Sequence, residues 1–268
     1  KKLNNKIKVI MAVHVLGNST HIEEIAKIAK SRNIFLIEDT CESLGAKYKN
    51  KHLGTFGDFG TYSFYYSHQM TSGEGGMIVC NSKKDYELIF SMRSHGWSRR
   101  LKVKDTSFNF INSGFNLRPL EVSAAIGLNQ FKRLNSMIKS RIGNREKIIK
   151  RLINSPLWNN QFSFLQITKN VKPSNFGLPI FINKKYLPKK KKFFKFLQKK
   201  EIETRIVISG NFANQPSVKL YNFNLENENF PKAQEIEDRG FFIGLHTKSI
   251  TEEMLNYLEK NLLKIDKL

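Results

Sequence analysis

Strand and helix signals alternate at short range through roughly the first 130 residues, and this restricts the chain to folds built on a parallel sheet. Residues 9–17 (VIMAVHVLG) and 34–39 (IFLIED) carry apolar strand patterns. The periodicity between them predicts a helix with Ser19 or Thr20 as its N-cap and Glu23 as a capping-box partner. Parallel strands need such a crossover, so this order indicates an α/β fold.

Two more strand patterns and a helix follow. Residues 54–66 are punctuated by glycine and rich in β-forming residues, and residues 75–80 (GGMIVC) form a short apolar run. Residues 83–96 have helical periodicity, and Gly96 is expected to close that helix, because glycine tolerates the left-handed conformation of a helix end. These elements continue the alternation that predicts a mainly parallel sheet.

The longest helical pattern spans residues 119–154, with Pro119 at the first helical position. The composition then becomes polar and irregular, which predicts a domain boundary. We expect a large cofactor-binding domain at residues 1–154, ending in this connecting helix, and a smaller C-terminal α/β domain at residues 155–268. The smaller domain includes a predicted strand at residues 203–209 (ETRIVIS).

Charge is the least ordinary bulk property, because the 268 residues carry a formal net charge of +22. Such a charge is compatible with a nucleic-acid binder, a membrane-surface protein or an enzyme for anionic substrates. Residues 184–200 are rich in lysine and predict a helix from Lys189, with Phe193, Phe194 and Leu197 on its inner side. We interpret these lysines as a solvated face, so nucleic-acid binding is supported by charge alone.

The cysteines and the start of the chain bear on location. Cys41 and Cys80 form no CxxC pair, which favours a reducing, cytoplasmic compartment over a disulfide framework. No apolar run reaches the ~18–20 residues of a membrane span, and no signal-peptide pattern opens the chain. A strand pattern begins almost at once, at Val9, without an initiating methionine. We therefore expect the N-terminal part of the large domain to be missing from this chain.

Asp39 and His68 occupy positions suited to chemistry. Asp39 ends a buried strand, where open α/β sheets place ligands, although an acid there can also cap the next helix. Glu38 should point to the opposite face of the strand. His68 lies between a strand and a glycine-rich turn, so an acid–base role competes with a structural one. The histidines show no HxH or HxxxH spacing, and no metal site is predicted.

Two polar clusters are candidate substrate-binding sites. In GFNLRP, Asn116 and Arg118 flank the predicted start of the long helix, a suitable place to bind phosphate, with an ordinary turn as the alternative. In ETRIVISGNFANQP, the polar donors Arg205, Asn211 and Gln215 gather near a predicted strand end. We take Arg118, Arg205 and Asn211 as candidate substrate contacts.

Five segments in one order and spacing resemble a known family. They are EDTCESLGAKYKNKHLGTFGDFGTYSF, SGEGGMIV, RSHG, GFNLRPLEVSAAIGLNQFKRL and TRIVISGNF. Over nearly the whole chain the combination resembles the DegT-type sugar aminotransferases, a branch of the fold-type-I vitamin B6 enzymes. The resemblance implies an aspartate-aminotransferase-like fold, with a three-layer domain around a mainly parallel sheet and a smaller C-terminal α/β domain.

The resemblance also implies roles for individual residues. Asp39 matches the carboxylate that pairs with the pyridine nitrogen of the cofactor and keeps it protonated. Ser63 matches the hydroxyl that binds the cofactor phosphate, and Glu42 falls where many relatives have a glutamine near the ring hydroxyl. Asn116 matches the asparagine that reaches a neighbouring subunit's cofactor, which implies a homodimer with shared active sites.

His68 stands where the family carries the lysine that bonds covalently to the cofactor. An imidazole cannot form that bond, and the adjacent Gln69, Met70 and Thr71 offer no amine. One explanation is a degenerate, inactive enzyme. The other is the 3-dehydrase branch of the family, which carries histidine at this position within a similar SFY–SH–EGG pattern.

That branch implies dehydration rather than simple amine transfer. The cofactor would be pyridoxamine 5′-phosphate (PMP), interconverting with pyridoxal 5′-phosphate (PLP), and the substrate a nucleotide-linked 4-keto-6-deoxyhexose. His68 would take the C4′ proton and deliver one to the leaving 3-hydroxyl, giving a 3-deoxy sugar for surface polysaccharide. No cysteine lies in residues 97–113, where an iron–sulfur branch should carry its ligands. The cluster-free type is therefore favoured, with PMP regenerated from an amino donor such as glutamate.

Two other functions stay open at this point. A PLP-dependent nucleotide-sugar 4-aminotransferase would share the fold and the cofactor, but it would need another lysine near the cofactor. A basic nucleic-acid-binding protein would show an affinity that collapses with salt and ignores nucleotide-sugars.

Overall fold

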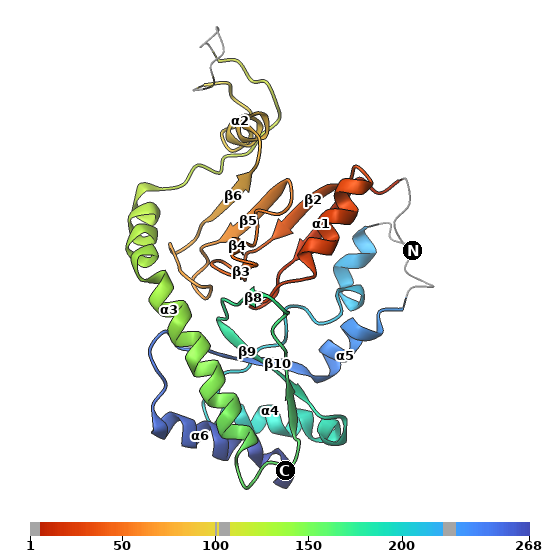
Figure 1. Ribbon diagram of the computed structural model, residues 1–268, viewed down its shortest axis with the longest axis vertical. Coiled ribbons are helices and arrows are strands. Elements are labelled where there is room, and N and C mark those ends of the chain that lie inside the picture. The colour runs from red at the N-terminus through yellow and green to blue at the C-terminus, as the bar shows by residue number, and fades with distance from the viewer. Residues whose placement is uncertain (1–5, 100, 102–107, 222–228) are drawn as a thin grey trace. The chain divides into compact units, whose positions relative to one another are not determined.

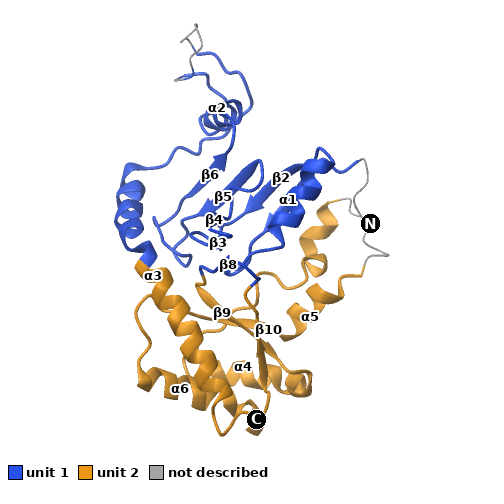
Figure 2. Cartoon of the chain, in the orientation of Figure 1, with its two compact units in different colours: residues 1–135, 168–174 blue, residues 136–167, 175–268 orange. Residues whose placement is uncertain are grey.

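The computed structural model describes residues 6–99, 101, 108–221 and 229–268 (Figure 1). The chain divides into two compact units, of which unit 1 comprises residues 1–135 and 168–174 and unit 2 the remainder (Figure 2). The division falls inside helix α3 (Glu121–Ile153), not after it as the change in composition suggests. The reason lies in packing: Gly127 faces Met70 and Ser72 of unit 1, whereas Ile148 and Leu152 belong to the core of unit 2.

Unit 1 contains a sheet in the order β1-β2-β5-β6. The strands are β1 (Val9–Val13), β2 (Phe35–Asp39), β5 (Phe59–Ser63) and β6 (Gly76–Cys80). The first three are parallel, and β6 runs antiparallel to β5. Helix α1 (Ile22–Ser31) connects β1 to β2. The prediction of a mainly parallel sheet is therefore confirmed.

The two faces of this sheet differ in burial. On one face, Ile22 and Ala29 of α1 pack with Ala12 and Leu36 in a buried apolar cluster. Alternate strand residues point to the other face. These residues are exposed by 44–58%: Val9, Met11, Val13 and Phe35. Asp39 shares this second face with Phe35, because both occupy odd positions of β2.

The expected capping box at the start of α1 is wrong. The N-cap is His21, and no side chain caps the helix. Glu23 instead accepts hydrogen bonds from the Tyr48 hydroxyl at 2.9 Å and from Lys49 Nζ at 2.7 Å. Tyr48 ends β3 (Lys47–Tyr48), which lies between β4 (Lys51–His52) and β8 (Val171–Lys172) in a small second sheet. Glu23 thus joins α1 to the end of β3 instead of capping its own helix.

The next two helices have different bounds from those that the sequence pattern predicts. Helix α2 (Lys83–Met92) ends before Gly96, which has φ +79° in the turn that follows. A Cβ at Gly96 would meet the carbonyl oxygen of Asn112, so this glycine permits a close approach, and its N–H also donates to Ser91 O at 2.8 Å at the end of the helix. Helix α3 begins at Glu121, two residues after Pro119, so Pro119 precedes the helix.

Unit 2 is built on a three-stranded antiparallel sheet in the order β10-β9-β7. Its strands and α-helices are β7 (Phe162–Phe164), β9 (Gly177–Ile182), α4 (Lys190–Lys199), α5 (Pro231–Arg239), β10 (Gly240–Gly244) and α6 (Glu252–Leu262). Short 3-10 helices lie at Lys184–Lys189, Phe212–Asn214, Pro216–Leu220 and Leu263–Lys267. The sheet and α4 enclose an apolar core that includes Ile180, Phe193 and Phe241.

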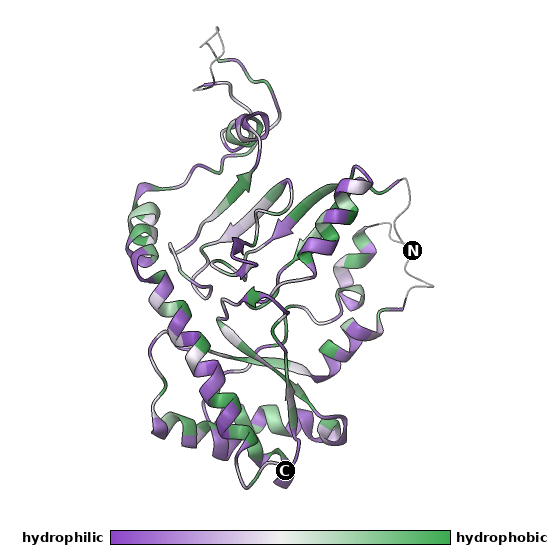
Figure 3. Cartoon of the chain, in the orientation of Figure 1, coloured by the Kyte–Doolittle hydropathy of each residue, from purple (hydrophilic) through white to green (hydrophobic). Residues whose placement is uncertain are grey.

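The lysine-rich helix is confirmed as amphipathic. Phe193 and Leu197 are fully buried in α4, and Phe194 is partly buried, whereas Lys191, Lys192 and Lys195 are exposed. Figure 3 shows the same mixture of hydrophobic and hydrophilic residues along α3. The exposed lysines thus form the solvated face of α4, away from its buried apolar side, as the spacing predicts.

The predicted strand at residues 203–209 is wrong. Within it, Arg205 pairs with Phe242 of β10 through an isolated bridge, and the segment then turns. Ile208 has φ +53°, a left-handed conformation that cannot continue an extended strand. The segment therefore forms a single bridge, because its backbone reverses direction before a second pair of residues can hydrogen-bond to β10.

The first half of the predicted strand at residues 54–66 is a loop that presses against β5. A Cβ at Gly60 would lie 2.0 Å from the carbonyl oxygen of Gly54, so the two backbones touch. Gly54 itself has φ +87°, which few residues other than glycine adopt. These contacts explain the glycines of GTFGDFG.

Gly60→Ala is expected to lower the free energy of unfolding by about 3 kcal/mol or more, because backbone cannot yield to the added methyl group. Gly143→Ala is the matched control: Gly143 lies in α3, and a methyl group added there would meet nothing within 4 Å. This control should gain about 1 kcal/mol from helix propensity. Urea denaturation measures both changes. Equal effects of the two substitutions would contradict the packing at Gly60.

Candidate active site

The carboxyl ends of the parallel strands of unit 1 bring the first candidate residues together. Val13 pairs in register with Asp39, and Asp39 pairs with Thr61, so β1, β2 and β5 end at one edge of the sheet. Asp39 and Ser63 are the last residues of their strands. This is the edge at which open α/β sheets bind ligands.

Asp39 is half-buried and held in a fixed orientation. Its Oδ1 accepts hydrogen bonds from Cys41 N at 3.1 Å and from Thr61 Oγ1 at 3.3 Å. Within the described part of the chain both donors reach the same oxygen, Oδ1, and none reaches Oδ2. A fixed carboxylate with one oxygen left toward the open face is suited to bind a cationic or N–H group.

The neighbouring acid, Glu38, points to the opposite face, as predicted, and organises the loop after it. It is fully buried, and its carboxylate accepts hydrogen bonds from Gly54 N, Phe56 N and Gly57 N at 2.5–2.8 Å. Burial opposes ionisation of Glu38, but the hydrogen bonds from His14 and from these backbone groups outweigh it and lower the pKa. Glu38 therefore stays a carboxylate with a structural role that no sequence pattern indicated.

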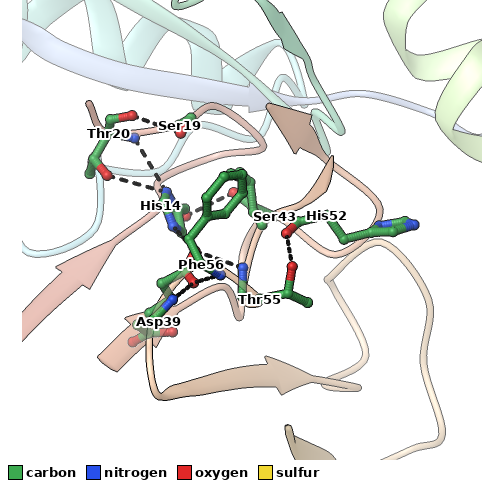
Figure 4. Close-up of polar contacts among 12 residues, drawn as sticks. His14, Ser19, Thr20, Asp39, Ser43, His52, Thr55 and Phe56 are labelled. Atoms are coloured by element: carbon green, nitrogen blue, oxygen red, sulfur yellow. Dashed lines mark hydrogen bonds and ion pairs between the residues drawn. The ribbon is translucent and has the colours of Figure 1, made fainter. Parts of the chain in front are cut away.

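His14 completes this buried network, which Figure 4 shows around Thr20 and Phe56. Its Nδ1 lies 3.3 Å from Thr20 N, which donates to it, and its Nε2 lies 3.1 Å from Glu38 Oε2. Because Nδ1 accepts, the ring proton is on Nε2 and points at the carboxylate. His14 thus ties the segment after β1 to the end of β2.

His68 lies in the segment that follows β5. Its ring meets the ring of Tyr65 edge-on, with 5.6 Å between the centroids. Burial lowers the pKa of His68 below 6.5, and the negative charge of Asp39 opposes this shift in part. The charge of Asp39 therefore acts on His68, and the imidazole is neutral near pH 7. A neutral imidazole can accept a proton, which suits the predicted acid–base role.

Glu42 and Ser63 lie at the same strand edge. Glu42 Oε2 accepts a hydrogen bond from Leu16 N at 2.9 Å. Burial raises the pKa of Glu42 to about 7, and the nearby charge of Asp39 adds to this, while the bond from Leu16 opposes it. The Ser63 hydroxyl accepts a hydrogen bond from Tyr65 N at 3.2 Å. The structure therefore brings Asp39, Glu42, Ser63 and His68 into one region of unit 1.

Asn116 and Arg118 also belong to unit 1, but not to a helix start. Asn116 pairs with Ser94 through an isolated bridge, five residues before α3 begins. Arg118 Nη2 lies 3.5 Å from Asn116 Oδ1, and both residues are exposed. Among the described residues, no hydrogen bond joins them to Asp39 or His68. The sequence argument for phosphate binding at a helix N-terminus therefore does not hold at these positions.

Arg205 and Asn211 belong to unit 2. Arg205 is exposed, and its Nε donates to Glu203 Oε1 at 2.9 Å. Asn211 is buried, with its backbone N–H bound to Glu237 Oε2 at 2.7 Å and its side-chain amide bound to Gln234 Oε1 at 3.2 Å. The Asn211 amide thus has a structural function in joining its loop to α5.

Metal-binding clusters and membrane-spanning helices are both absent from the described residues. In that part of the chain, no group of three or more His, Cys, Asp or Glu side chains is arranged to hold a metal ion. Across the same residues, no helix is both long and apolar enough to cross a membrane.

Glu42→Gln is expected to raise the free energy of unfolding by about 1–3 kcal/mol near pH 8 and to leave it unchanged near pH 4. A raised pKa means that the folded protein binds the proton more tightly than the unfolded chain. The parent protein therefore loses stability as the pH rises from 4.5 to about 7. The glutamine of the variant mimics the protonated form and avoids this loss. Urea denaturation at both pH values measures the effect, with Glu24→Gln on exposed α1 as control. An equal change at both pH values would contradict it.

The amino-acid sequence and the fold both match a known protein family. A profile described as the DegT/DnrJ/EryC1/StrS aminotransferase family matches residues 1–260. The chain is 34% identical over 272 residues to GDP-4-keto-6-deoxy-D-mannose 3-dehydratase of Escherichia coli O55:H7, covering 96% of this chain and 68% of that protein.

Solved structures agree with this result. The E. coli GDP-4-keto-6-deoxy-D-mannose 3-dehydratase with bound hydrated PLP has a TM-score of 0.85 at 34% identity, covering 97% of this chain and 68% of that one. A GDP-4-keto-6-deoxymannose 3-dehydratase structure with a trapped PLP–glutamate geminal diamine has a TM-score of 0.87 at 34% identity. The match covers 97% of this chain and 69% of that one. The expected aspartate-aminotransferase-like, fold-type-I architecture is confirmed. The chain belongs to the DegT/DnrJ/EryC1/StrS aminotransferase family.

Proposed function

We propose that this protein is a lyase that removes the 3-hydroxyl of a nucleotide-linked 4-keto-6-deoxyhexose, using PMP and PLP, in the synthesis of deoxysugars for surface polysaccharide. The 3-dehydratase relatives named above support this reaction class. A nucleotide-sugar substrate and a reducing environment for Cys41 and Cys80 are both consistent with a cytoplasmic enzyme.

The observation that carries the proposal is that His68 occupies the position of the family's lysine and that no lysine lies near it in the sequence. His68 follows Ser63 by five residues, and no lysine occurs between Lys51 and Lys83, in a chain with 45 lysines and arginines. A transaminase of this family needs a lysine amine at that position to bond its cofactor. A neutral imidazole beside Asp39 can move protons but cannot make that bond. This favours dehydration over the alternative, a nucleotide-sugar 4-aminotransferase.

The side chains at the sheet edge fit the cofactor. The Oδ2 atom of Asp39 would accept a hydrogen bond from the protonated pyridine nitrogen. Ser63 would bind the phosphate, and Glu42 would lie near the ring hydroxyl. These groups supply the carboxylate, hydroxyl and second acid that such a ligand needs. Bound there, PMP would supply an amine for the 4-keto carbon and a ring that stores an electron pair.

His68 then performs the proton transfers. In its neutral form it would accept a proton at the bound cofactor and would pass a proton to the 3-hydroxyl, which would leave as water. Its lowered pKa suits the first step, because the ring is free to accept a proton near pH 7. The charge of Asp39 stabilises the imidazolium that results. His68 thus acts first as base and then as acid.

The remaining partners follow from chemistry and from the relatives. We assign the amino donor as glutamate, since a relative has been trapped with a PLP–glutamate adduct. Arg118 in unit 1 and Arg205 in unit 2 are each exposed, and each offers a guanidinium group to an anionic substrate. No cysteine lies in residues 97–113, which argues against an iron–sulfur cluster. Residues 100 and 102–107 of that segment lie outside the described residues.

A homodimer with shared sites is the assembly that we infer. Large apolar side chains, each exposed by 44–80%, surround Asn116 in sequence: Phe108, Phe110, Ile111, Phe115, Leu117, Leu120, Val122, Ile126, Leu128 and Phe131. Exposed apolar clusters of this kind mark protein interfaces. A second copy seated on this surface would bring Asn116 toward the cofactor of its neighbour.

Phe131→Glu is expected to convert the dimer to a monomer, because a buried, unpaired carboxylate is costly in an apolar interface. Analytical ultracentrifugation measures the mass. Tyr257→Glu, at an exposed residue of α6 in unit 2, should leave the dimer intact. A parent protein that sediments as a monomer at micromolar concentration would contradict the assembly.

His68→Asn is expected to reduce formation of the 3-deoxy product by about 100-fold or more, since an amide cannot carry the proton. Asn preserves the size and polarity of the residue, so cofactor binding, followed by absorbance, should be retained. His95→Asn, on the turn after α2, is the control and should retain activity. Unchanged dehydration in His68→Asn would show that His68 is not the base.

A further inference from the structure

The segment that carries His68 is fixed at its two ends by backbone hydrogen bonds. Phe64 N donates to Gly75 O at 2.9 Å, and Ser72 N donates to Phe64 O at 3.0 Å. These bonds close residues 64–75 into a loop after β5. The middle of the loop is attached through Gln69, which is only 1% exposed. His68 N donates to Tyr65 O at 3.1 Å within the loop, and the bonds of Gln69 attach this part of the loop to the rest of unit 1.

The side-chain amide of Gln69 binds two backbone carbonyl groups. Its Nε2 donates to Ser174 O at 2.8 Å and also to Glu42 O. An amide nitrogen has two hydrogens, so these two bonds use both. Glu42 lies three residues after Asp39, in the turn that follows β2. One amide thus joins the loop of His68 to the turn that begins at Asp39.

Ser174 anchors this amide and is itself fully buried. Its backbone N–H donates to Gly17 O at 2.9 Å, and its hydroxyl donates to Leu44 O at 2.6 Å. Its carbonyl accepts the bond from Gln69. Each polar group of Ser174 thus holds a different segment, one after β1, one after β2 and one after β5. Hydrogen bonds are strengthened in a buried, low-dielectric environment, so these contacts restrain the three segments.

We propose that Gln69, anchored by Ser174, is a positioning residue that holds the His68 loop against the turn that follows Asp39. The proposal rests on the proposed function, in which His68 moves protons at the reacting sugar. Catalytic groups must be held within about 0.5 Å of their productive geometry. A misplacement of about 1 Å can cost about 100-fold in rate. The hydrogen bonds inside the loop shape it, and the bonds of Gln69 fix it relative to the turn after β2.

The test replaces Gln69 with methionine, which has a similar length and no donor. In the cofactor-free protein, the pKa of the His68 imidazole, measured by NMR titration, should rise toward its ordinary value as water reaches the ring. With PMP and a nucleotide-linked 4-keto-6-deoxyhexose, kcat should fall by about 10–100-fold while KM changes by less than about 3-fold. Gln198→Met, at an exposed residue of α4, should change none of these values.

Ser174→Ala is a milder second variant, because it removes only the hydroxyl bond to Leu44. It should move the His68 pKa and kcat in the same directions by smaller amounts. Unchanged values of both in folded Gln69→Met protein, or in Ser174→Ala if the first variant does not fold, would overturn the proposal. A lower melting temperature with an unchanged His68 pKa would also overturn it, because that result indicates a purely structural role. The titration needs no turnover, so an inactive parent would count against the proposed function alone.

Discussion

Glu38 lies buried at the end of β2 and accepts three backbone N–H groups from residues 54–57 together with the ring of His14. A carboxylate removed from water is stable only when such donors surround it. The loop of residues 53–58 is therefore folded around this charge and pressed against Gly60 of β5. Because strand neighbours point to opposite faces, this anchoring also fixes Asp39 on the open face of the sheet.

The chemistry of the site follows from that fixed carboxylate. Asp39 influences two titratable neighbours, since its charge raises the pKa of Glu42 and opposes the lowering of the pKa of His68. The result is one acid with a pKa of about 7 and one neutral imidazole at the strand edge where Asp39 lies. Groups whose environments separate their pKa values are suited to act as acid and base in turn. Dehydration needs both roles, whereas amine transfer by this family needs a lysine.

Local sequence patterns predicted the elements that depend on local order. The parallel strands, the position of Asp39 at a strand end and the apolar side of α4 follow from periodicity. The failures involve contacts between distant segments. Glu23 binds Tyr48 and Lys49 instead of capping α1, Ile208 reverses the backbone of a β-rich pattern, and Ser174 reaches Gln69 across 105 residues. The assigned roles of Arg118, Arg205 and Asn211 came from clustering in sequence, which does not determine proximity in space.

The most direct measurement follows carbon 3 of the sugar by NMR. The purified protein would be incubated in D₂O with PMP and a GDP-linked 4-keto-6-deoxyhexose, the nucleotide of the E. coli relative. We predict that the 3-hydroxyl is lost and that C3 becomes a methylene group carrying deuterium from solvent. A product that retains the 3-hydroxyl and carries an amine at C4 would contradict the assignment of His68 as the residue that directs this site to dehydration.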